Sequence, residues 1–244
     1  MDIREKFLQE VKENIDALKS DEDVQALSRI WVREITRHNY AYNFSWMGRP
    51  IIQFPQDMIA MQEIIWRTKP DLIIETGVAH GGSIIYYASL LELMGNNGTV
   101  LGIDIDIREH NREAIEAHPM YKNIQLLEGS SVDQITFERV KEVAHGASNV
   151  LVILDSNHTH EHVLKELELY SQLVTKNNYL VVFDTLIEDM PDDLIHDRPW
   201  KKGNNPKTAV RQFLNENDRF VIDKDIEAKI LITVAPDGYL KCVK

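Results

Sequence analysis

Apolar positions follow two alternating periodicities along most of the chain. From residue 56 to residue 184, segments with apolar residues every three or four positions alternate with short continuous apolar runs. Continuous runs are typical of parallel strands that helices cover on both faces. The predicted strands span residues 71–77, 99–106, 124–129, 149–155 and 179–184, and the predicted helices span 56–70, 83–95, 108–119, 133–145 and 159–174. This repetition of strand and helix predicts a doubly wound α/β sheet.

The two ends of the chain depart from this alternation. Residues 1 to about 39 predict two helices, broken at Asp21-Glu22-Asp23, where an acidic side chain can cap the second helix. The aromatic segment 40–54 shows no clear period. Near the C-terminus, residues 219–226 and 229–243 are rich in strand-forming types, and Pro236-Asp237-Gly238 is predicted to join two strands. A mostly parallel sheet of seven strands that ends in an antiparallel hairpin is the arrangement of Rossmann-like methyltransferases.

Length and charge restrict the class of protein. The 244 residues are 43% hydrophobic, which favours one domain over residues 1–244 with a helical extension at about 1–55. A net charge of -12 and the lack of a Lys/Arg cluster argue against a nucleic-acid partner. The lone Cys242 excludes a disulfide framework and a cysteine-based zinc site. A charged N-terminus and no apolar run approaching about 18 residues predict a cytoplasmic protein without an integral membrane segment.

Each of the five predicted strands ends in an acidic residue. In open parallel sheets, ligands bind beyond the carboxyl ends of the strands. These ends carry Glu75, Asp104, Glu128, Asp155 and Asp184. Acidic residues also favour the first turn of a following helix, which offers a second explanation for one or two of the five. The pattern nevertheless indicates a binding site at this edge of the sheet.

The first of these strands runs into a glycine turn, "IIETGVAHGGS" (residues 73–83). Its glycines are expected to let the backbone approach a ligand, and Ser83 is expected to cap the next helix. Glu75 would repel a pyrophosphate but suits a cationic amino group, and Asp104 is placed to bind a ribose diol. S-adenosylmethionine meets both demands. The predicted cofactor residues are Glu75, Gly77, His80, Gly81, Gly82, Ser83, Asp104, Ser130 and Ser131.

A second set of candidates lies at the ends of the fourth and fifth strands. Asp155 and Asp184 can share a hard cation such as Mg²⁺, which binds oxygen and keeps several waters; alternatively, both cap turns or helices. His158 is the candidate general base, since a histidine accepts a proton near neutral pH, although a lone histidine is more often structural. His160 and His162 are expected to point to solvent on the following helix.

Several stretches together resemble the cephalosporin hydroxylase and rhamnosyl O-methyltransferase family over residues 40–244. The similar stretches are "DLIIETGVAHGGSIIYYASLLE", "VLGIDIDIR", "LEGSSVD", "VILDSNHTHEHVLKELELYSQLV", "YLVVFDTLIEDMP", "RPWKKGNNPKTAVRQFLNENDRFVID" and "LITVAPDGYLK". The resemblance implies a Rossmann-type methyltransferase fold, bound S-adenosylmethionine, Mg²⁺ at the tips of strands four and five, and a homo-oligomer. It identifies Asp155 as one metal ligand.

One departure from the family pattern concerns the metal. Some members carry a Glu-Asp pair at the tip of strand five, whereas this chain has Phe183-Asp184, so Asp184 matches and Phe183 supplies no oxygen. Thr185 or a water is expected to fill the gap.

The function predicted from the sequence is Mg-assisted O-methylation of a hydroxyl of a sugar, glycolipid or secondary metabolite, in lipid or polysaccharide biosynthesis. The alternatives are a cephalosporin-hydroxylase-like oxidoreductase, a nicotinamide-dependent enzyme, and a nucleotide-binding protein without catalysis. No 2-His-1-carboxylate arrangement supports an iron oxygenase. Residues 40–54 and 186–208 are expected to shape the acceptor pocket.

Overall fold

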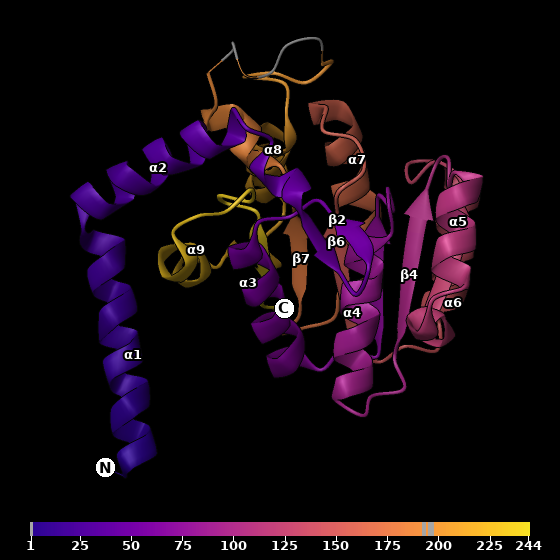
Figure 1. The fold of residues 1–244 in the computed structure, drawn as a ribbon, viewed down its shortest axis with the longest axis horizontal. Helices are drawn as coiled ribbons and strands as arrows, with labels where there is room; N and C mark the ends of the chain where they lie inside the picture. The colour runs from indigo at the N-terminus through magenta and orange to yellow at the C-terminus, as the bar shows by residue number, and fades with distance from the viewer. Residues whose placement is uncertain (1, 192–193, 195–197) are drawn as a thin grey trace.

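The central element is a seven-stranded sheet with the order β5-β4-β3-β6-β7-β9-β8 (Figure 1). The computed structural model describes residues 2–191, 194 and 198–244. The five predicted parallel strands are confirmed, and β9 pairs antiparallel with both β7 and β8. The strands are β3 (Leu72–Thr76), β4 (Thr99–Asp104), β5 (Ile124–Glu128), β6 (Val150–Leu154), β7 (Tyr179–Val182), β8 (Phe220–Ile222) and β9 (Tyr239–Cys242).

Helices cover both faces of the sheet, as the continuous apolar strands require. Along β3, Ile73 belongs to one core cluster, whereas Leu72 and Ile74 belong to the other, because side chains alternate between the faces. One face packs against α3 (Pro55–Thr68), α4 (Gly82–Leu93), α5 (Glu109–Glu116) and α9 (Lys224–Ile230), and the other against α6 (Gln134–Ala144), α7 (His160–Tyr170) and α8 (Pro206–Glu216). The 3₁₀ turns are η1 (Tyr40–Asn43), η2 (Pro119–Asn123), η3 (Ser171–Leu173) and η4 (Thr185–Asp189).

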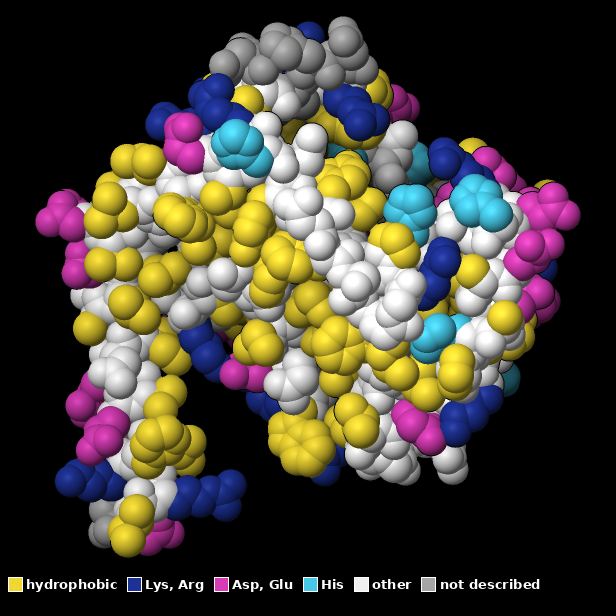
Figure 2. Space-filling view, viewed as in Figure 1, with side chains coloured by type: hydrophobic (Ala, Val, Ile, Leu, Met, Phe, Trp, Pro, Cys, Tyr) yellow, Lys and Arg dark blue, Asp and Glu magenta, His cyan; other side chains and the backbone are white. Residues whose placement is uncertain are grey.

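The N-terminal helices form an arm that extends from the body of the molecule (Figure 1). They are α1 (Ile3–Ser20) and α2 (Glu22–Thr36), and Asp21 caps α2 by accepting a hydrogen bond from the Val24 amide, as the sequence predicts. No residue of α1 is buried. Apolar side chains of the arm therefore face solvent, which Figure 2 shows as hydrophobic patches; the exposed members are Ile3, Phe7, Leu8, Leu27, Ile30 and Trp31.

A short hairpin that the sequence pattern did not reveal follows the arm. It consists of β1 (Phe44–Trp46) and β2 (Arg49–Ile51), joined through Met47 and Gly48. Both turn residues have positive φ, 45° and 86°, as a two-residue hairpin turn of type I′ demands. The strands are too short for the alternation to be visible in the sequence. The hairpin lies against α4 and closes one side of the candidate site.

The C-terminal region differs from the sequence prediction in the position of its turn. The predicted antiparallel hairpin is confirmed, but it joins β8 and β9, and α9 lies between them. Pro236-Asp237-Gly238 therefore does not join two strands. Residues 231–235 lie in no strand, because the buried carboxylate of Asp57 on α3 holds them instead: it accepts hydrogen bonds from the Thr233 hydroxyl at 2.5 Å and the Val234 amide at 2.9 Å.

The long loop predicted at 186–208 falls partly outside the described residues. Its described parts include η4 and the segment 198–205 that leads into α8. Asn205 caps α8 by accepting from the amides of Lys207 and Thr208. Across the described part of the chain, none of the helices combines the length and apolar character needed to span a bilayer.

Removal of the Asp57 carboxylate should destabilise the fold. Asp57→Ala would leave three buried donors without an acceptor: the Thr233 and Tyr239 hydroxyls and the Val234 amide. We expect the free energy of unfolding to fall by about 3 kcal/mol, measured by urea denaturation at neutral pH. The control Asp218→Ala removes an exposed carboxylate that pairs with Lys244 and should leave the midpoint almost unchanged. Equal midpoints for the two variants would contradict this role of Asp57.

Candidate active site

The glycine turn after β3 is shaped by contacts within the chain. Gly77 and Gly81 adopt φ values of 93° and 80°, which favour glycine. The carboxylate of Asp104, at the tip of β4, accepts hydrogen bonds from the amides of Val78 at 2.8 Å and Ala79 at 3.2 Å. Asp104 therefore braces the turn. It is half-buried and retains further acceptor capacity, since a carboxylate offers about four lone-pair sites.

The glycines have a steric cause different from the predicted one. A Cβ at Gly77 would come within 2.0 Å of the Asp155 carbonyl oxygen, and one at Gly82 within 2.1 Å of the Pro50 carbonyl oxygen. At Gly81 a Cβ would meet the Ile115 side chain at 2.5 Å. Close packing within the chain thus suffices to explain these glycines, and their contact with a ligand stays a prediction.

Glu75 lies beneath the turn and does not line the cavity described below. Its side chain is fully buried, and its carboxyl oxygen Oε2 accepts a hydrogen bond of 2.7 Å from the Ser83 hydroxyl. The other oxygen, Oε1, has no protein partner. Burial raises the pKa of Glu75 to about 8, against an ordinary value of 4.5. The carboxyl group is therefore mostly neutral at pH 7. This weakens the prediction that Glu75 is a charged carboxylate that attracts a cationic amino group.

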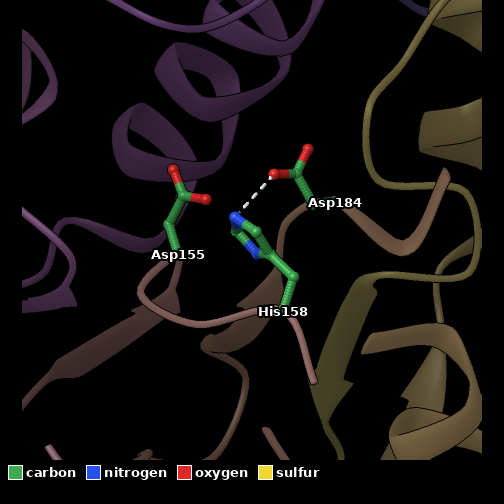
Figure 3. A group of neighbouring side chains, drawn as sticks. All are labelled: Asp155, His158 and Asp184. Atoms are coloured by element: carbon green, nitrogen blue, oxygen red, sulfur yellow. Dashed lines mark ion pairs between the residues drawn. The ribbon is translucent and has the colours of Figure 1, made fainter. Parts of the chain in front are cut away.

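The second set of candidates forms one cluster at the tips of β6 and β7. One donor atom from each of Asp155, His158 and Asp184 lies within 4.8 Å of the other two, and the three side chains converge (Figure 3). His158 Nε2 lies 3.1 Å from Asp184 Oδ2. Burial, and next the charge of Asp184, raise the pKa of Asp155 well above its ordinary range. Asp184 has φ 55°, a left-handed conformation that is uncommon outside glycine and frequent at functional sites.

Neighbouring groups fix the two loops that carry this cluster. The ring of Trp200 meets that of His158 edge to face, with centroids 4.7 Å apart. Asn157 Oδ1 accepts from the Thr159 amide and hydroxyl, both at 2.9 Å, which tightens the turn after β6. After β7, the buried Lys207 pairs with Asp189 at 2.6 Å and anchors η4 to α8. The cluster is therefore held from several sides.

His160 and His162 do not point freely to solvent, in contrast to the expectation. His160 Nδ1 contacts the Thr208 hydroxyl at 2.8 Å, so this residue connects α7 to α8. His162 Nε2 lies 3.0 Å from the Ser131 hydroxyl and 3.2 Å from the Ser156 hydroxyl. Helix α7 lies against α8 and the loops after β5 and β6, and this packing turns both rings inward. Ser131 is buried and directed to His162 rather than to the cavity.

A cavity of about 560 Å³ joins the glycine turn to the acidic cluster. Among the predicted residues, the cavity is lined by Gly77, His80, Gly82, Ser83, Asp155, His158 and Asp184, whereas Glu75, Gly81, Asp104, Ser130 and Ser131 do not line it. Many of its remaining lining residues are apolar or aromatic, among them Tyr40, Tyr42, Phe54, Phe183, Leu186, Ile187, Met190, Leu194 and Trp200, and polar residues such as Asn39, Gln53 and Arg198 also line it. This volume is in the range of small-molecule sites.

Two contributors to the site were missed by sequence reasoning. Arg49 on β2 donates to the His80 carbonyl oxygen, at 2.7 Å from Nη2 and 3.0 Å from Nε, and so supports the turn. Trp200 packs on His158 from a segment more than 40 positions away. The only signal was the aromatic and basic character of residues 40–54 and 198–202, which suggested a pocket but no contact.

The chain is similar in sequence to a described family and to named O-methyltransferases. A family model described as rhamnosyl O-methyltransferase/CmcI matches residues 38–243. A rhamnosyl O-methyltransferase of Mycobacterium tuberculosis is 30% identical over 200 residues, which are 80% of this chain and 77% of that protein. The Mycobacterium leprae protein of the same name is 30% identical over 205 residues, 83% and 85% of the two chains.

Solved structures show the same fold. A structure of CmcI with Mg and SAM has a TM-score of 0.59 and 21% identity, and the match covers 83% of this chain and 78% of that one. A structure of CmcI with SAH has a TM-score of 0.51 and 17% identity, over 81% of each chain. The doubly wound sheet with its antiparallel end is therefore a methyltransferase-type fold.

The buried Glu75 should make stability depend on pH in a defined direction. Between about pH 4.5 and pH 8 the unfolded chain loses the Glu75 proton while the folded protein keeps it, so the free energy of unfolding falls as pH rises. The side chain of the Glu75→Gln variant cannot ionise, so the free energy of unfolding of this variant should fall less as pH rises. Urea denaturation of both proteins across that pH range measures the difference. Parallel curves would show that the pKa of Glu75 is not raised.

Proposed function

The chain belongs to the rhamnosyl O-methyltransferase/CmcI family, and on this premise we propose that it is an S-adenosylmethionine-dependent O-methyltransferase. The observation that carries the proposal is the single cavity in which the turn after β3 meets the Asp155–His158–Asp184 cluster. Methyl transfer to oxygen needs a cofactor site and a site that activates a hydroxyl side by side. Residues proposed for both sites line this cavity, which supports the proposal.

The residues of the turn fit S-adenosylmethionine. Asp104 keeps spare acceptor capacity beside the turn, and the turn carries no Lys or Arg side chain that would favour a phosphate. Glu75 is proposed to support the turn from beneath through its hydrogen bond with Ser83. We propose that Ser83, His80 and the backbone at Gly77 contact the cofactor from the cavity side. Gly81, Ser130 and Ser131 are proposed to support that site from outside the cavity. When bound, S-adenosylmethionine supplies an activated methyl group.

The acidic cluster fits a divalent cation. Asp155 and Asp184 present carboxylates to the same space, and two carboxylates with several waters can hold Mg²⁺. A bound cation favours ionisation of a hydroxyl that it contacts, as it does for water. The chain itself would position the acceptor hydroxyl against the cofactor, which is the main source of rate in such a transfer. The role of His158 as general base stays a prediction. Its Nε2 faces both carboxylates.

The acceptor is proposed to be a sugar hydroxyl, because the curated relatives are named rhamnosyl O-methyltransferases. The apolar walls of the cavity, which include Tyr42, Ile187 and Trp200, suit an acceptor that carries an apolar portion beside the hydroxyl. Such an acceptor belongs to glycolipid, polysaccharide or secondary-metabolite synthesis in the cytoplasm.

Cofactor binding tests the proposed function directly. Titration calorimetry of the purified protein should give binding of S-adenosylmethionine and of S-adenosylhomocysteine, and no binding of NAD. In the presence of a rhamnose-bearing glycolipid, mass spectrometry should detect the gain of one methyl group by the acceptor. Binding of NAD together with no binding of S-adenosylmethionine would instead support a nicotinamide-dependent enzyme.

We also propose that the protein is a homo-oligomer that forms through α1 and α2. No residue of α1 is buried even though the helix contacts α9, and both helices expose several large apolar side chains. Leu27 and Trp31 lie one turn apart on α2 and are 64% and 58% exposed. A second copy of the chain would bury these faces.

Light scattering of the purified protein should give a mass of at least twice the 28.2 kDa of one chain. The double variant Leu27→Glu/Trp31→Glu should lower this mass, because it puts charge on the apolar face. Leu93→Glu serves as the matched control, since Leu93 is 80% exposed on α4 and lies outside the arm. A monomeric wild-type protein would contradict the proposal, as would an unchanged mass of the double variant.

A further inference from the structure

The Asp155–His158–Asp184 cluster has the dimensions of a chelate with one nitrogen and two oxygens. Two ligand atoms bound to one ion at about 2.0–2.2 Å lie within about 4.4 Å of each other. The three donor atoms here lie within 4.8 Å of one another. Movements of roughly half an ångström would bring all three to a common ion. Among the described residues, this is the single group of three such side chains with that spacing.

The orientation of His158 suits a metal ligand. Its Nε2 points toward both carboxylates and lies 3.1 Å from Asp184 Oδ2 (Figure 3). A cation placed between the three side chains can therefore be bound by this nitrogen and by both carboxylates at once.

The nearby oxygen donors are engaged elsewhere. The Thr185 hydroxyl, expected from the sequence to complete the site, donates to the Pro236 carbonyl oxygen at 2.7 Å and is fully buried. The Ser156 hydroxyl donates to Glu166 at 2.7 Å. Phe183 lines the cavity but supplies no donor. Thr185 also does not line the cavity, whereas the donor atom of His158 lies within 4.8 Å of both carboxylates, so His158 is the candidate that joins Asp155 and Asp184.

We propose that His158 Nε2 is the third protein ligand of the cation, and that the site consequently prefers a first-row transition ion such as Mn²⁺, Fe²⁺ or Co²⁺ over Mg²⁺. This inference rests on the proposed cation-assisted function and replaces the assignment of His158 as general base. Mg²⁺ binds oxygen ligands and accepts imidazole poorly, whereas imidazole suits the transition ions. Trp200 supports the ligand by holding the imidazole ring at its edge.

The test uses Mn²⁺, Co²⁺ and Mg²⁺ as probes on the whole protein, with His158→Gln as the variant and His160→Gln as the control. His160 contacts Thr208 and Gln212 and does not line the cavity, so its loss should leave metal binding unchanged. Pulsed EPR of the Mn²⁺-loaded wild type should show coupling to an imidazole nitrogen. This coupling should disappear in His158→Gln and persist in His160→Gln.

Calorimetry provides the second measurement. His158→Gln should weaken Co²⁺ at least tenfold more than Mg²⁺, because only the transition ion loses a favoured ligand. Equal Co²⁺ affinity in wild type and His158→Gln, with no nitrogen coupling, would overturn the inference even if methyl transfer requires the cation. A variant that keeps its metal affinity but loses turnover would restore His158 as the general base. If none of the three ions binds the wild type, the proposed cation site is contradicted. The proposed binding of S-adenosylmethionine is tested separately by its own titration.

Discussion

The close approach of Gly77 to the Asp155 carbonyl is the constraint on which the rest of the site depends. The turn after β3 and the loop after β6 belong to adjacent parallel strands, and nothing larger than hydrogen fits between them at this point. Their spacing sets the distance between the proposed cofactor site and the proposed cation site. In methyl transfer this distance must match the separation of donor and acceptor, since misplacement by about 1 Å can cost 10²-fold in rate. The glycine thus sets this spacing, in addition to the contact with the cofactor proposed for its backbone.

Buried acidic groups surround the floor of the site. Glu75, Asp57 and Glu166 are fully buried. Burial, and next the charge of Asp184, raise the pKa of Asp155, and the three buried acidic groups add smaller contributions in the same direction. Hydrogen bonds compensate part of the free-energy cost of burying these carboxyl groups. Asp57 accepts three hydrogen bonds, whereas Glu75 and Glu166 each keep one oxygen without a protein partner. Such uncompensated groups are unfavourable for folding. Their concentration beneath one cavity is the usual mark of a functional site rather than of a structural core.

The positions of the chemical groups were more predictable from the sequence than their contacts. Asp104, Asp155 and Asp184 lie at one rim because parallel strands place their carboxyl ends together, and the apolar runs were enough to locate those strands. Contacts between distant segments were not predictable. The direction of His162 depends on the packing of α7 against two loops, and residues 231–235 are held by Asp57 from α3, far away in the chain. An apolar run such as "KILITV" predicts a strand, because the contact with Asp57 cannot be seen in the sequence.

The same limit explains why the role proposed for His158 differs from the predicted one. In the sequence, His158 is the nearest of three histidines to a strand tip, and its ability to accept a proton near neutral pH favoured a general base. In the structure, its Nε2 completes a set of three donors while the alternatives, Thr185 and Ser156, bond to other groups. An oxygen lost at position 183 can be replaced by a nitrogen from a neighbouring loop without change of fold, because both loops end at the same rim. In this proposal the preferred cation depends on the donor set at the rim and not on the fold.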